Sequence, residues 1–158
     1  METFIEITDC DTITEVLKKA FMTVAINFGF TKENAPRFPA FIAPEYIEKQ
    51  LNSGLKIFGH YIEDQIAGCA GYSYYKDQIY FIERLAVLPE YRHMGIGRKL
   101  MEFAENKIRE NNGKIAEIHV IDKNTILREW YKNLGYHEIR TDELKSMPYN
   151  SVVMIKEL

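Results

Sequence analysis

Residues 82–101, IERLAVLPEYRHMGIGRKLM, constrain the fold of this chain more than any other segment. The first of them have the apolar and β-branched character of a strand, which Pro89 brings to an end. A short basic loop with glycines at positions 95 and 97 follows, and an amphipathic helix begins directly after it. This layout directs backbone N–H groups and the positive end of a helix dipole at one point, where glycines let a ligand approach the backbone. We therefore expect the loop to bind phosphate or pyrophosphate.

The length and composition of the chain indicate one domain that spans residues 1–158. A domain of this size buries about 70% of its unfolded surface, and no linker divides the sequence. The net charge of −3 argues against a general nucleic-acid-binding protein, and no stretch approaches the ~20 apolar residues of a membrane span. We expect neither a nucleic-acid nor a membrane partner. Two cysteines without CxxC spacing, and an N-terminus without a signal-peptide pattern, favour the cytoplasm.

Hydrophobic periodicity predicts about seven strands and four helices. Strands at 55–63, 66–75 and 79–87 are separated by tight turns and form an antiparallel meander. Thr12 and Glu15 read as a capping box at the start of the first helix, and Gly29 as its end. In the helix that begins near residue 96, Glu105 falls on the stripe expected to face water. The other strands are expected at 4–7, 115–121, 136–140 and 152–156, and the other helices at 45–52 and 124–133.

Three phosphate-binding loops and a ligand-free turn compete as interpretations of the glycine loop. A nucleotide P-loop needs GxxxxGK[ST], which does not occur in this sequence. A dinucleotide fingerprint needs GxGxxG, but Leu100 stands at the third glycine position, and the preceding strand belongs to an antiparallel meander. A glycine turn without a ligand stays open as an alternative.

The third phosphate-binding interpretation rests on a resemblance. The segment LAVLPEYRHMGIGRKL, residues 85–100, resembles the acetyl-CoA loop of the GNAT superfamily of N-acetyltransferases. Asn124 and the downstream segment WYKNLGY, residues 130–136, are similar to a second motif of that superfamily. The resemblance implies an α/β (α+β) fold with a mixed, mostly antiparallel central sheet flanked by helices on both faces. It also implies acetyl-CoA as co-substrate.

Carried over by position, the resemblance assigns residues to the parts of acetyl-CoA. It implies that backbone amides across the glycine loop hold the pyrophosphate, and that the main chain before Pro89 pairs with the pantetheine arm. It further implies that Arg92 adds charge near the phosphates and that Asn124 contacts the pantetheine region. The implied cofactor-binding residues are Leu85, Ala86, Val87, Arg92, His93, Met94, Gly95, Ile96, Gly97, Arg98 and Asn124.

Acetyl transfer to an amine needs a proton acceptor for the amine and a proton donor for the leaving thiolate. Glu83 is the candidate base, because strand alternation places it on one face with Phe81, Leu85 and Val87, whereas Arg84 points the other way. An ion pair or a solvated strand end would explain Glu83 equally well. Tyr131, which the resemblance implies reaches the sulfur, is the candidate acid, and core packing is its alternative explanation.

Other reactive side chains carry weaker signals. Cys10 lies far from the motif and Cys69 within a strand, so we expect direct attack by the amine rather than an acyl-enzyme. The histidines at positions 60, 119 and 137 lie in predicted strands without ligand spacing, so we expect structural roles for them and no metal site.

The sequence as a whole is typical of an N-acetyltransferase that moves the acetyl group of acetyl-CoA to a primary amine. The acceptor, a small amine, an amino acid, an antibiotic or a protein amine, is left open. The alternative function is a non-catalytic acyl-CoA sensor or regulatory module on the same fold. A homodimer is a possible assembly, because symmetric dimers are common.

Overall fold

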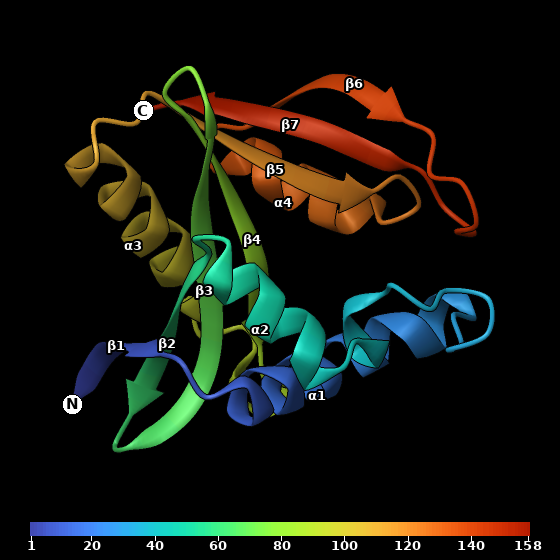
Figure 1. Ribbon diagram of the computed structural model, residues 1–158, viewed down its shortest axis with the longest axis horizontal. Coiled ribbons are helices and arrows are strands. Elements are labelled where there is room, and N and C mark those ends of the chain that lie inside the picture. The colour runs from blue at the N-terminus through green and yellow to red at the C-terminus, as the bar shows by residue number, and fades with distance from the viewer.

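A mixed sheet of seven strands in the order β1-β2-β3-β4-β5-β7-β6 runs through the computed structural model, which describes residues 1–158 (Figure 1). Only β4 and β5 are parallel neighbours, and every other pair is antiparallel. The strands are β1 (Glu2–Ile7), β2 (Lys56–Ile62), β3 (Gln65–Lys76), β4 (Ile79–Val87), β5 (Ile115–Ile121), β6 (His137–Asp142) and β7 (Ser151–Glu157). The helices are α1 (Cys10–Phe28), α2 (Pro44–Asn52), α3 (Ile96–Glu110) and α4 (Thr125–Asn133), with short 3-10 turns at Pro39–Phe41 and Pro89–Tyr91. The predicted fold class is confirmed.

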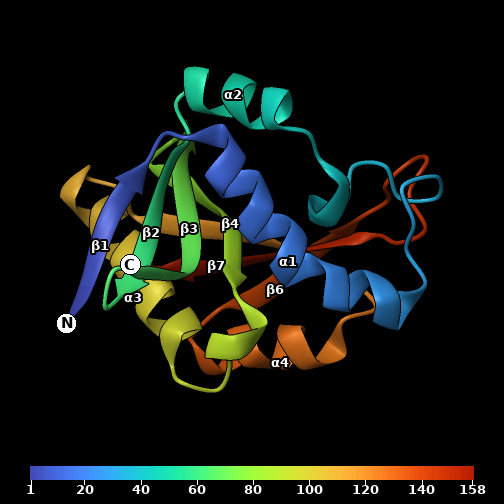
Figure 2. The ribbon, with the colours of Figure 1, turned by 90° about the horizontal axis from the view of Figure 1, so that it is seen from below.

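Helices cover both faces of the sheet. Figure 2 shows α1 and α2 on one side of it and α3 and α4 on the other. On the first side, Leu17 of α1 and Ile47 of α2 pack with Ile57 of β2. On the second, Met101 of α3 and Tyr131 of α4 pack in a core that includes residues of β4, β5 and β7. No helix has the length and apolar character that crossing a bilayer demands.

The two parallel strands separate after a short paired stretch. Ile79–Phe81 of β4 pair with Ile115–Glu117 of β5, and no pair follows, although β4 continues to Val87 and β5 to Ile121. Figure 1 shows the two strands diverging from this point. The result is a gap in the middle of the sheet, at the carboxyl ends of two parallel strands.

β4 carries a β-bulge at Arg84. Between the paired positions Cys69–Ala86 and Gly71–Glu83, one residue of β3 lies opposite two residues of β4. Arg84 adopts a left-handed backbone conformation with φ of 60°, which is uncommon for a residue other than glycine. The bulge is therefore a locally strained feature next to the gap.

The bulge changes which side chains of β4 share a face. Glu83 and Arg84 both reach Gln50 of α2 on one face of the sheet. Leu85 and Val87 instead pack beneath α3 on the other face. The expectation that Glu83 shares a face with Leu85 and Val87 is wrong, and so is the expectation that Arg84 points away from Glu83. Both rested on uninterrupted alternation, which an inserted residue breaks.

Several element boundaries differ from the predicted ones by a few residues. Helix α1 is capped by Asp9, whose carboxylate accepts from the Thr12 backbone N–H at 3.0 Å, so Thr12 is not the cap. Gly29 ends the helix with φ of 71°, as predicted. The two hairpin turns, predicted at Asp64-Gln65 and Lys76-Asp77, lie at Glu63-Asp64 and Asp77-Gln78, where all four residues adopt positive φ.

One acidic side chain of α3 is buried against expectation. Glu105 is 3% exposed, and its carboxylate accepts from Lys156 Nζ at 2.9 and 3.2 Å. The Tyr136 hydroxyl donates to the same carboxylate at 3.1 Å. A basic residue from the last strand thus draws Glu105 toward the sheet. Helical periodicity alone does not reveal such a partner.

Candidate active site

The loop after β4 presents a continuous row of unpaired donors. The six consecutive backbone N–H groups from His93 to Arg98 donate to no acceptor in the protein, and no side chain caps α3. His93 and Gly95 adopt left-handed conformations, with φ of 62° and 76°. No acidic residue lies in the first turn of α3. Unpaired N–H groups at the positive end of a helix dipole form an anion-binding concavity.

The side chain of Arg92 is bound to another part of the protein. Its Nη2 donates to the Ala20 carbonyl of α1 at 2.7 Å, and its backbone N–H donates to the Pro89 carbonyl at 3.3 Å. Arg92 therefore fastens the glycine loop to α1. A contribution of its charge to phosphate binding stays a prediction.

Gly97 contacts α4. A Cβ built at Gly97 would lie 3.2 Å from the nearest atom of the Trp130 ring, and the φ of Gly97 is not positive. Gly97 thus lets the N-terminus of α3 approach Trp130 closely. At Gly95, by contrast, a Cβ would meet nothing within 4 Å, and only the positive φ favours glycine.

The backbone of β4 is free on the side that faces the gap. Ala86 and Val87 pair with Cys69 and Gly68 of β3, but no residue of β5 pairs with this part of β4. An extended chain with amide groups, such as a pantetheine arm, fits an open strand edge of this kind. The phosphates of the same ligand fit the unpaired N–H groups that follow.

Asn124 begins α4 at the same edge of the sheet. Its side-chain oxygen accepts from the Leu127 backbone N–H at 3.1 Å and caps the helix. Its side-chain nitrogen has no partner in the protein and remains a potential donor to a ligand. The structure therefore assigns Asn124 a structural role, and its contact with pantetheine stays a prediction.

Glu83 lies where β4 bends away from β5. Its Oε1 accepts from Gln50 Nε2 at 3.2 Å. Burial raises the pKa of Glu83, while the charges of Arg84 and His119 and the Gln50 hydrogen bond partly oppose that rise. A carboxylate whose pKa is raised toward neutral pH is a better proton acceptor for chemistry at that pH than an ordinary glutamate.

His119, for which the sequence predicts only a structural role, lies near enough to Glu83 to influence its charge. Its ring contacts Phe81 edge-on, with centroids 5.6 Å apart, and its Nε2 lies 2.8 Å from Glu117 Oε2. Glu117 is 5% exposed. The spacing of Glu117 and His119 by two in a strand could have revealed their shared face, but not their position beside Glu83.

Tyr131 lies on the opposite face of the sheet from Glu83. It is 7% exposed and packs edge-on against Trp130 and Tyr136, with ring centroids 5.0 and 5.8 Å away. Its hydroxyl makes no hydrogen bond within the protein, and burial raises its pKa. Leu85 of β4 packs against the same core cluster, next to the gap. A protonated hydroxyl without a partner in the protein is available as a proton donor.

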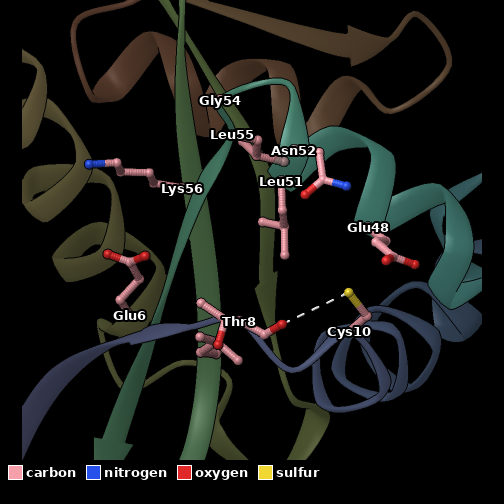
Figure 3. A pocket seen from close by; sticks show the side chains of 10 residues that line it. Glu6, Thr8, Cys10, Glu48, Leu51, Asn52, Gly54, Leu55 and Lys56 are labelled. Carbon is pink, nitrogen blue, oxygen red and sulfur yellow. Dashed lines mark hydrogen bonds between the residues drawn. The ribbon is translucent and has the colours of Figure 1, made fainter.

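Both cysteines are free, and the Cys69 thiol donates to the Arg84 carbonyl at 3.4 Å. Burial raises the pKa of Cys69 to about 12, and the pKa of Cys10 is also raised, chiefly by desolvation. Cys10 lines a hollow of about 470 Å³ between α1, α2 and the first two strands. Figure 3 shows its thiol turned toward Thr8, whose carbonyl accepts its hydrogen bond. A thiol that resists ionisation is a poor nucleophile.

Comparison with known proteins places these features in a family. Residues 21–136 match the family model described as the acetyltransferase (GNAT) family. An uncharacterised N-acetyltransferase of Chlorobaculum tepidum is 31% identical over 106 residues. This match covers 60% of the chain and 65% of the relative, so the chain spans less than two thirds of the length of that protein.

Two solved structures are similar over nearly the whole chain. The PaiA N-acetyltransferase of Thermoplasma acidophilum, solved in complex with coenzyme A, has a TM-score of 0.76 and 17% identity and covers 100% of this chain and 99% of its own. The ribosomal-protein-S18-alanine N-acetyltransferase of Escherichia coli has a TM-score of 0.77 and 16% identity, with coverages of 99% and 94%. At these identities the likeness establishes the fold and leaves the acceptor undetermined.

Proposed function

Because the chain belongs to the acetyltransferase (GNAT) family, we propose that it transfers the acetyl group of acetyl-CoA to a primary amine. We further propose that residues 1–158 form one N-acetyltransferase domain. The observation that carries this proposal is the row of six unpaired N–H groups, His93 to Arg98, at the open end of the gap between β4 and β5. Pyrophosphate on these groups lets the pantetheine arm extend along Leu85–Val87 into the gap. The coenzyme A bound to the PaiA relative supports the same ligand here.

The reaction we propose is direct attack in a ternary complex. Acetyl-CoA supplies an activated acyl carbon as its thioester. The amine nitrogen forms a bond to that carbon, the carbon–sulfur bond breaks, and the amine loses a proton while the departing sulfur gains one. The raised pKa values of both cysteine thiols favour this route over an acyl-enzyme.

Glu83 is the proposed proton acceptor and Tyr131 the proposed proton donor. They lie on opposite faces of the sheet with the gap between them, so the amine can approach from the α1/α2 face and the sulfur can lie toward α4. Glu83 takes the amine proton, either directly or through one water. The Tyr131 hydroxyl, protonated at neutral pH, gives a proton to the thiolate, whose pKa resembles that of a cysteine, roughly 8.5.

Release of free thiol with a panel of amines tests the activity. An acetyltransferase produces thiol only when an accepted amine is present. Coenzyme A and acetyl-CoA should also raise the melting temperature, and NADH and ATP far less, because binding to the native state stabilises it. Stabilisation by coenzyme A without thiol release from any amine would favour the non-catalytic sensor. Equal stabilisation by NADH would overturn the loop assignment.

The cellular compartment, the acceptor and the oligomeric state are part of the same proposal. Two free cysteines, one fully buried, are typical of a reducing compartment, and we propose the cytoplasm. We propose a small amine or a peptide amine as acceptor. Sedimentation velocity with and without coenzyme A distinguishes a monomer from a homodimer.

A further inference from the structure

We propose that Arg84 recognises a carboxylate on the acceptor, so that the acceptor is an amino acid that carries this group close to its reacting amine. The inference rests on the proposed acetyltransferase function and deepens it by naming a substrate class. Four observations support it: the bulge, the unpaired charge of Arg84, the role of Gln50 and the position of Tyr46.

The bulge places Arg84 beside Glu83 at a cost in backbone strain. With φ of 60°, Arg84 adopts a conformation that glycine, asparagine or aspartate tolerates better. A strained residue persists where the surrounding structure requires its side chain in one position. Here the strain turns the guanidinium onto the α1/α2 face, where Glu83 also lies.

The guanidinium of Arg84 forms no salt bridge, although its charge acts on the neighbouring Glu83. Its Nε and Nη2 donate to the same neutral atom, Gln50 Oε1, at 3.0 and 2.9 Å. Two of its five N–H donors are thus used, and three remain. Arg84 is only half-exposed, and a partly desolvated cation is stabilised by an anion. The unused donors form an edge that suits bidentate binding of a carboxylate.

Gln50 holds Arg84 and Glu83 at fixed positions and apart from each other. Its side-chain oxygen accepts from Arg84 while its side-chain nitrogen donates to Glu83 at 3.2 Å. No direct hydrogen bond joins the two charged groups. Because both bonds end on one amide, Glu83 and Arg84 flank the Gln50 side chain as close neighbours. An acceptor with its carboxylate on Arg84 and its amine near Glu83 must carry the two groups close together, as an amino acid does.

Tyr46 supports the same edge of the site. The Arg84 guanidinium lies over its ring, 5.6 Å from the centroid, and Tyr46 stands one helical turn before Gln50 on α2. Tyr46 is 48% exposed, so this part of α2 is accessible from solvent. The aromatic face restricts the guanidinium to one plane, which reduces the entropy lost when a ligand binds.

Matched pairs of acceptors test the inference. Each pair contains an amino acid and the amine that lacks its carboxylate: L-phenylalanine and 2-phenylethylamine, L-methionine and 3-(methylthio)propylamine, L-lysine and 1,5-diaminopentane. The measured quantity is the ratio of kcat/KM within a pair, compared between the native protein and the Arg84→Gln variant. Differences in amine basicity cancel in this comparison. We expect the ratio for the preferred pair to fall by about 10- to 100-fold, the effect of losing a charge-assisted bidentate contact.

Control variants separate recognition from general damage. Lys49→Gln removes an exposed positive charge from α2, the helix that carries Gln50, and should leave the ratio unchanged. Arg84→Lys keeps the charge but not the planar fork and should give an intermediate ratio. Stabilisation by coenzyme A reports whether each variant is folded. An unchanged ratio in folded Arg84→Gln overturns the inference, as does a native preference for the amines that lack a carboxylate.

A binding measurement keeps the inference testable if no amine is acetylated. Calorimetric titration of the six compounds into protein saturated with coenzyme A needs no turnover. Binding of an amino acid that Arg84→Gln abolishes would support carboxylate recognition even where the proposed function fails. Absence of amino-acid binding to the native protein would overturn the inference.

Discussion

Gln50 Nε2 donates a hydrogen bond to Glu83 Oε1 at 3.2 Å, which connects helix α2 to the candidate base on β4. The bond favours the charged carboxylate and opposes the desolvation that raises the pKa of Glu83. Its removal should therefore raise that pKa further. In Gln50→Leu, the acidic limb of the pH–rate profile should move to higher pH, and activity at neutral pH should fall. A limb that stays in place would show that Glu83 does not govern the profile.

Glu83→Gln removes the proposed proton acceptor with little change in shape. We expect kcat to fall by about 10²- to 10⁴-fold and the acidic limb to vanish, while coenzyme A affinity is kept. At pH values above the folded-state pKa of Glu83, the substitution should also raise the free energy of unfolding. A group with a raised folded pKa contributes stability below its unfolded pKa and loses that contribution as pH rises. Thermal melts from pH 4 to pH 9, paired with steady-state rates, measure both effects; a native-like pH profile would return Glu83 to a structural role.

Tyr131→Phe removes one hydroxyl and keeps the ring packing. We expect kcat to fall by about 10²-fold, in the range of lost general-acid catalysis. The melting temperature should change little, because the hydroxyl makes no hydrogen bond within the protein. An acetyl donor with a more acidic thiol should restore much of the lost rate, since its leaving group needs a proton less. Full activity, or loss through unfolding alone, would show that Tyr131 serves only packing.

Gly97→Val should weaken coenzyme A binding through Trp130 rather than by filling the pyrophosphate site. A Cβ at this position meets the Trp130 ring at 3.2 Å, so a branched side chain must displace that ring or the start of α3. We expect about tenfold weaker binding, equivalent to ~1.4 kcal/mol of overpacking. The double variant Gly97→Val, Trp130→Ala should recover part of the loss. Thermal shift with coenzyme A measures each step, and unchanged affinity in Gly97→Val would contradict this account.

Glu105→Ala should destabilise the fold without altering the chemistry. The variant leaves the Lys156 ammonium and the Tyr136 hydroxyl without their shared acceptor. We expect a loss of about 2 kcal/mol in unfolding free energy, below the value for a fully buried pair because Lys156 is partly solvated. Glu102→Ala, an exposed site on the same helix, is the control. Urea titration compares the two, and equal stability would show that the cluster contributes nothing net.

Much of the fold could be predicted because local patterns and the final structure agree. The end of α1 at Gly29 and the start of α4 near Asn124 were predicted from local sequence signals, and contacts elsewhere in the fold do not override them. The N–H row of the glycine loop follows in the same way from its position between a strand and a helix. These features depend on residues that are close together in the sequence.

The sequence predictions that the structure overturns concern residues whose positions depend on contacts distant in sequence. Arg84 gives no local sign that an extra residue is inserted there, and the bulge depends on how β3 and β4 pair. The burial of Glu105 depends on Lys156, and the relation of His119 to Glu83 depends on the spacing of two different strands. Such features belong to the tertiary structure, and strand or helix periodicity does not encode them.

The separation of β4 from β5 has a consequence for the lifetime of the protein. The strand ladder between the two parts of the sheet has only three residue pairs. A pantetheine arm in the gap would act as an additional strand and complete one continuous ladder of amide groups. Local opening of the native state should then begin at this seam and be suppressed by the donor. The supply of acetyl-CoA would set the resistance of the folded chain to proteolysis as well as the rate of the reaction.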